Sequence, residues 1–143
     1  MNNRSLILYR AVGLGMAVAF AIVGGLFLFL PGGVITFFNT LSGHLGMSKA
    51  PLADRSFFGV LAVAYMYVVT LLAWFMYRVP GQKLYPLLLG HAKFASSFLS
   101  FGMFFFHAPL LIYLINGIVD AGLGLLALVM FFSVRTQAKE RAL

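Results

Sequence analysis

LLIYLINGIVDAGLGLLALVMFFSV, residues Leu110–Val134, is an apolar run with one charged residue, Asp120, near its middle. A helix of about 20 residues crosses the roughly 30 Å hydrocarbon core of a bilayer, so this run is long enough to span it. A carboxylate at that depth costs about 2.5 kcal/mol or more unless it is paired, protonated or facing a polar cavity. We therefore expect Asp120 to have a partner inside the membrane.

The composition of the whole chain indicates an integral membrane protein. Of 143 residues, 62% are hydrophobic and 9% are charged, and the mean hydropathy is +1.00. Soluble domains are about 45–50% apolar and about 25% charged, so these residues could not cover a water-exposed surface. We expect a single membrane domain over residues 1–143, with the lipid bilayer as its surroundings.

The cysteine content and the distribution of charge argue against several kinds of site and against one kind of partner. The absence of cysteine removes disulfides, thiolate nucleophiles and cysteine-ligated metal sites. The net charge of +7 would suggest nucleic acid for a soluble protein. Here most Lys and Arg residues lie at the ends of apolar runs, where they meet lipid headgroups. Nucleic acid is therefore not an expected partner.

Four apolar runs are each long enough to cross the bilayer. The expected spans are residues 9–30, 56–77, 86–107 and 110–134. Proline and glycine, which break helices, fall between them at residues 31–33, 79–81 and 108–109. The sequence predicts an all-α membrane protein of four transmembrane helices in an antiparallel bundle, with a tight turn between the last two.

The distribution of Lys and Arg predicts the orientation, because basic residues favour the cytoplasmic side. Seven lie on one side of the predicted spans: Arg4, Arg10, Arg78, Lys83, Arg135, Lys139 and Arg141. Lys49 and Arg55 lie on the other side. We expect a multi-pass protein of the bacterial inner membrane, with both termini in the cytoplasm and residues 31–55 outside.

The outer segment between the first two spans carries an apolar pattern of its own. Its spacing of i, i+3, i+4, i+7 and i+11 is typical of one helical face. The residues concerned are Val34, Phe37, Phe38, Leu41 and Leu45. The pattern favours a short interfacial helix on the outer leaflet. The helix could instead cap the bundle or cover a ligand entrance. The alternative is a loop whose phenylalanines dip into lipid.

Small residues recur every four positions in the first span, at Gly13, Ala17, Ala21 and Gly25. Such a stripe lets a second helix approach closely, and close packing supplies much of the association energy in lipid. The partner is either another span of this chain or a helix of another subunit.

Polar residues on the third and fourth spans form one face each. Lys93, Ser96 and Ser100 are spaced i, i+3 and i+7, and Asn116 and Asp120 are one turn apart. Lipid offers no hydrogen-bond partners, so two such stripes on adjacent helices are buried at least cost against each other. We expect these five residues to form a polar intramembrane site. In it, Lys93 either pairs with Asp120 or extends to the cytoplasmic headgroups.

Two interpretations of this polar site stay open. Intramembrane charges favour function, so the residues could line a site for a proton, an ion or a polar headgroup. Alternatively, the ion pair is an interhelical clamp that fixes the register of the two helices.

The three histidines raise the possibility of a haem or quinone site. His91 and His107 lie near opposite ends of the third span, a separation that resembles membrane cytochromes. One bis-histidine haem could use His107 and His44. More often, histidines at helix ends bind headgroups or water. No metal site is expected, since the chain has no HExxH motif or His–carboxylate cluster, and the sequence identifies no cofactor.

Soluble-type catalysis has no support in the sequence. The acidic residues are Asp54, Asp120 and Glu140, with no nucleophile–base–acid arrangement and no phosphate-binding glycine loop. We expect that the protein is not an enzyme.

The order of elements resembles the DoxX-like group of small four-helix bacterial membrane proteins. The points of likeness are Arg10 with Gly13, Pro31-Gly32, Arg55 with Gly59, and the acidic Asp120 inside the fourth span. Members of that group are mostly uncharacterised, and some are linked to quinone-coupled redox enzymes as membrane subunits. The resemblance implies an accessory role.

Three functions are consistent with these patterns. The first is a non-catalytic accessory subunit that packs against other membrane subunits, or against copies of itself, through the small-residue stripe and the phenylalanine-rich surfaces. The second is a proton- or ion-coupled small carrier that uses Lys93 and Asp120. The third is a quinone-, lipid- or haem-binding electron-transfer subunit.

Overall fold

The computed structural model describes residues 3–51 and 57–140, and these residues fold into five helices without a strand. The helices are α1 (Asn3–Phe29), α2 (Pro31–His44), α3 (Phe57–Arg78), α4 (Leu84–Phe106) and α5 (Leu111–Glu140). Four of them, α1, α3, α4 and α5, are long and apolar enough to cross a bilayer. The predicted all-α class and the four candidate spans are confirmed at this level.

The helices break where proline and glycine predicted. A residue that precedes proline is disfavoured in the α region, and proline is well suited to the first turn of a helix. Leu30 accordingly has φ −132° and ψ 48°, so α1 ends before it and α2 begins at Pro31. In the turn between α3 and α4, Gly81 has φ +101°, a conformation that L side chains rarely adopt.

The helices differ from the predicted spans at their outer ends. α5 continues to Glu140 instead of ending at Val134, and α1 begins at Asn3 rather than at residue 9. Neither extension contains proline or glycine, so nothing in the sequence stops the helix once the apolar run ends. Arg55, Ser56 and Arg141 lie outside the described residues.

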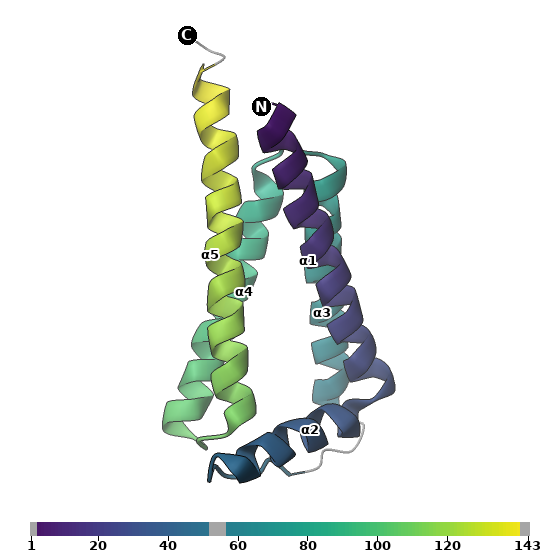
Figure 1. The fold of residues 1–143 in the computed structure, drawn as a ribbon, viewed down its shortest axis with the longest axis vertical. Coiled ribbons are helices and arrows are strands. Elements are labelled where there is room, and N and C mark those ends of the chain that lie inside the picture. The colour runs from purple at the N-terminus through teal and green to yellow at the C-terminus, as the bar shows by residue number, and fades with distance from the viewer. Residues whose placement is uncertain (1–2, 52–56, 141–143) are drawn as a thin grey trace.

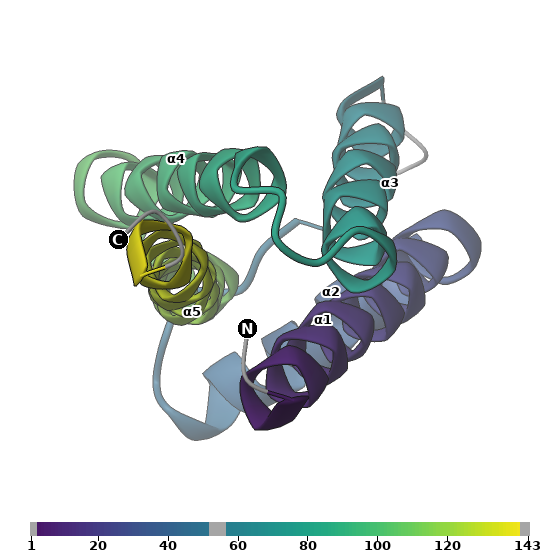
Figure 2. The ribbon, with the colours of Figure 1, turned by 90° about the horizontal axis from the view of Figure 1, so that it is seen from above.

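The long helices form two pairs (Figures 1 and 2). α1 packs most extensively on α3, and α4 packs most extensively on α5, whereas α3 and α4 share a smaller contact. The beginning of α1, the turn between α3 and α4, and the end of α5 lie at one end of the molecule (Figure 1). α2 lies across the opposite end, where it contacts both α1 and α5.

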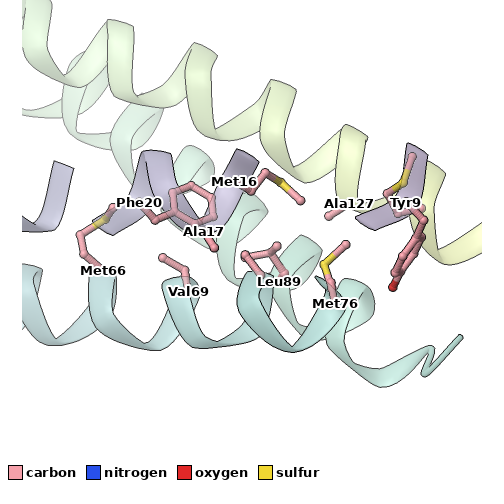
Figure 3. Packing of buried hydrophobic residues seen from close by; sticks show 11 residues of the cluster. Tyr9, Met16, Ala17, Phe20, Met66, Val69, Met76, Leu89 and Ala127 are labelled. Carbon is pink, nitrogen blue, oxygen red and sulfur yellow. The ribbon is translucent and has the colours of Figure 1, made fainter. Parts of the chain in front are cut away.

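The apolar core lies mainly between α1 and α3 (Figure 3). Its buried members are Tyr9, Met16, Ala17, Phe20, Met66, Val69, Ala73, Met76, Leu89, Ala127 and Met130. The second pair contributes Leu89, near the beginning of α4, and Ala127 and Met130, in the second half of α5. The two pairs therefore pack together in the half of the molecule that is distant from α2.

The small-residue stripe of α1 matches the packing in part. Gly13 and Ala17 are buried against α3, but Ala21 is exposed and a Cβ atom built on Gly25 would meet nothing within 4 Å. The second close approach to α3 falls at Gly24 instead, where a Cβ would lie 3.1 Å from a side chain of α3. Four residues advance a helix roughly 40° beyond a full turn, so a strict four-residue stripe drifts away from a fixed contact line.

The segment between the first two spans is a helix, α2, and not a loop. Its C-terminal connection folds back, because the Asn39 side chain donates to the Ala50 carbonyl at 2.8 Å and accepts from the Ala50 N–H at 2.7 Å. Phe37 and Leu41 remain exposed.

Candidate functional site

α4 and α5 bring the predicted polar residues together along one seam. Lys93 Nζ lies 2.9 Å from Asp120 Oδ1, and the two side chains are 3% and 5% exposed. Of the two expected positions for Lys93, the structure has the ion pair and not the extended one. Because both side chains are shielded from water, the attraction between the two charges is strong. Removing the two charges from water nevertheless costs free energy, which offsets part of this stabilisation.

The rings of the other helix pair cover the ion pair. Lys93 Nζ lies 4.5 Å from the ring centroid of Phe20 in α1 and 5.2 Å from that of Tyr65 in α3. Cation–π contacts at these distances add to the stabilisation of a desolvated ammonium. The Tyr65 hydroxyl also donates to the Ala92 carbonyl at 3.0 Å. The ion pair therefore lies where all four long helices meet.

The seam continues from the ion pair toward α2 as neutral hydrogen bonds. Ser97 Oγ donates to the Gly117 carbonyl at 2.7 Å. Asn116 Nδ2 donates to Ser100 Oγ at 2.7 Å and lies 3.4 Å from Ser96 Oγ. All five predicted residues thus lie along the contact between α4 and α5, as an ion pair and a separate set of neutral hydrogen bonds, which we together call the polar seam.

Two glycines let α4 and α5 approach closely enough for these bonds. A Cβ atom on Gly117 would lie 3.0 Å from the Phe101 ring, and one on Gly124 would lie 3.1 Å from the Phe94 ring. The ring of a phenylalanine from α4 therefore packs directly against each of these glycines of α5. The two helices are held together by this ring packing as well as by polar contacts.

Sequence reasoning missed three participants in the seam. Ser97 lies one turn after Lys93 on the same helical face, so its spacing could have identified it. Phe20 and Tyr65 belong to the other helix pair, and no local pattern links them to Lys93. Their role depends on how the two pairs meet.

The histidines lie outside the polar seam. His44, His91 and His107 are all exposed, and His91 Nδ1 lies 2.8 Å from the Leu87 carbonyl of its own helix. Over residues 3–51 and 57–140, no group of three or more His, Asp or Glu side chains could hold a metal ion. The expected haem or quinone contacts of these histidines stay a prediction.

A cavity opens between the two helix pairs at the end that α2 covers. Its volume is about 560 Å³, and α1, α2 and α5 form its walls. The lining residues are Val23, Leu26, Phe27, Leu30, Gly33, Val34, Phe37, Phe38, Ile112, Ile115, Asn116 and Val119. Among these described residues, Asn116 supplies the one polar side chain. The cavity therefore joins the polar seam at a single point.

Comparison with protein-family models, curated proteins and solved structures finds no match for the chain. The resemblance to the DoxX-like group accordingly stays a prediction from the sequence.

Proposed function

We propose that this chain is a non-catalytic, multi-pass membrane protein that binds one lipid-class molecule in the cavity between its helix pairs. The cavity of about 560 Å³ carries this proposal. Small-molecule sites typically have volumes of roughly 300–1,000 Å³ and mostly apolar walls with a few polar groups. The cavity fits that description.

The walls of the cavity favour a lipid-class ligand over a water-soluble one. The three helices that form it contribute aliphatic and phenylalanine side chains almost throughout. Two of these helices, α1 and α5, are candidate spans, so a molecule already dissolved in the bilayer could reach the cavity without crossing water. α2 would then cover the ligand from the membrane surface.

The same proposal places the chain in the bacterial inner membrane as an antiparallel bundle with both termini in the cytoplasm. Arg4, Arg10, Arg78 and Lys83 belong to the end of the molecule where α1 begins and α3 passes to α4. This agrees with the preference of basic residues for the cytoplasmic side. α2 then lies at the outer surface, with Phe37 and Leu41 toward lipid.

Single cysteines test this orientation, since the natural chain has none. Thr40 in α2 and Gln82 between α3 and α4 are both exposed. In intact bacterial spheroplasts, a membrane-impermeant maleimide should label Thr40→Cys and should label Gln82→Cys only after permeabilisation. The cysteine-free parent is the control. The reverse pattern would contradict the proposed orientation.

The ion pair acts as a clamp in this proposal rather than as a transport site. Lys93 and Asp120 are closed off by Phe20 and Tyr65 and are bonded to each other. A carrier would have to open this contact in each cycle and expose both charges. The carrier and accessory-subunit hypotheses stay predictions, and the latter is compatible with a bound lipid.

Filling the cavity tests ligand binding directly. The probe is hexadecanol with a diazirine at mid-chain, added to purified protein in lipid nanodiscs and cross-linked by light. We expect peptides from the α1 and α5 walls to be labelled. Val119→Trp should reduce this to the labelling that membrane-exposed peptides show, because an indole occupies the space next to Asn116.

Val129→Trp is the matched control for this test. Val129 is on the same helix and is similarly exposed, at 55% against 51% for Val119, but it does not line the cavity. Labelling of the cavity walls should be unchanged in this variant. Equal labelling of wall peptides in wild type and Val119→Trp would refute the binding site.

A further inference from the structure

We infer that the cavity selects a neutral lipid with a free hydroxyl group, which donates a hydrogen bond to Asn116 Oδ1. This inference rests on the proposed function, because it specifies the ligand of the same cavity. It follows from the way in which the Asn116 amide is held, from the absence of charge on the described walls, and from the depth of Asn116.

The polar seam uses the donor side of the Asn116 amide. Nδ2 carries two hydrogens, and it lies 2.7 Å from Ser100 Oγ and 3.4 Å from Ser96 Oγ. None of the described residues donates a hydrogen bond to Oδ1, because both hydrogen bonds of the Asn116 side chain involve Nδ2. Asn116 also lines the cavity. A ligand that carries an O–H group would satisfy this oxygen. A ligand with only carbonyl or ether oxygens would find no free donor on the amide.

The absence of charge restricts the ligand further. No described wall residue is acidic, basic or a histidine. The nearest carboxylate on α5 is Asp120, one turn from Asn116, and its charge is already paired with Lys93. Moving an ionised headgroup into such surroundings without a counter-charge is far more costly than moving a hydroxyl that gains a hydrogen bond. The bound polar group is therefore uncharged.

The position of Asn116 along α5 determines how much a hydrogen bond to its side chain stabilises a bound ligand. Asn116 lies five residues after the beginning of α5 at Leu111, which corresponds to roughly 8 Å along the helix. At that depth, lipid tails offer a hydroxyl no partner. The Asn116 amide is thus a fixed acceptor that a hydroxyl meets inside the apolar phase.

A pair of probes isolates the donor. Diazirine-bearing hexadecanol and its methyl ether have the same chain and the same label, but the ether has no O–H. Labelling of the cavity walls is divided by labelling of residues 98–106 of α4, whose exposed phenylalanines report the concentration of each probe in the bilayer. In the wild-type protein we expect the corrected labelling to favour the alcohol about fivefold, the typical worth of one hydrogen bond.

Two variants complete the test. Asn116→Leu keeps the approximate side-chain size and should label equally with both probes, whereas Ser100→Ala frees an amide hydrogen and should raise labelling by the ether. Equal labelling by both probes in the wild-type protein overturns this inference and needs no variant to interpret. If Val119→Trp still blocks both probes in that case, the cavity proposal survives; if wall peptides are labelled by neither probe, the proposed function itself fails.

Discussion

The Asp120→Leu protein is expected to lose about 3–5 kcal/mol of its free energy of unfolding, because the change leaves the buried Lys93 ammonium without a counter-ion. The ion pair is 2.9 Å long and both side chains are almost fully buried, so water cannot replace the lost carboxylate without opening the bundle. The measurement is thermal or chemical unfolding of the purified protein in a mild detergent, followed by circular dichroism at fixed protein concentration.

The double variant Lys93→Met/Asp120→Leu separates the cost of an unpaired charge from loss of packing. Replacing a whole buried ion pair with apolar residues of similar size is often neutral or stabilising, so most of the lost stability should return. His91 is exposed and lies two residues from Lys93, so His91→Ala is the control and should change the free energy of unfolding little. A double variant that is less stable than Asp120→Leu would contradict the clamp.

Gly13→Leu should be the second most damaging change, at about 1–3 kcal/mol of destabilisation from overpacking. A Cβ on Gly13 would lie 3.0 Å from the Tyr77 backbone nitrogen and 3.2 Å from the Ala73 carbonyl oxygen. These are backbone atoms of α3 and cannot rotate away, so α1 and α3 would have to separate. The unfolding midpoint in detergent should fall, and the protein should elute earlier on size exclusion.

Gly25→Leu provides the matched control on the same helix. Both glycines belong to the stripe that the sequence suggested, but a Cβ on Gly25 meets nothing within 4 Å. The same substitution should therefore leave stability almost unchanged. Leucine is a better helix former than glycine, so propensity cannot account for a loss of stability. Equal losses for the two variants would therefore contradict the role given to the contact between Gly13 and α3.

The sequence predicts the local features of this fold well. The breaks at Pro31, Pro80 and Pro109 follow from the chemistry of proline, which acts on its own helix and needs no tertiary information. The contact between Lys93 and Asp120 was also within reach, since both lie on polar faces of consecutive helices. The interactions that determine these features lie within one helix or between two helices that follow each other in the chain.

Features that depend on how the two helix pairs meet could not be predicted in this way. α1 and α5 diverge toward α2 (Figure 1), and the cavity lies between them at that end. Hydropathy could not indicate this, because it is the same for a helix that faces lipid, a neighbouring helix or a cavity. Phe20 and Tyr65 cover Lys93 from the other pair, which no spacing indicates. Asn116 was recognised as polar, but its place between the seam and the cavity emerges only from the assembled helices.

The position of the two charges on consecutive helices has a consequence for biogenesis. α4 and α5 are separated only by residues 107–110, so both can leave the translocon together. An isolated helix with an ionised residue at its centre enters lipid at a cost of several kcal/mol. With ammonium and carboxylate already matched, the last two helices partition as a nearly neutral unit, before any contact with the N-terminal half is required.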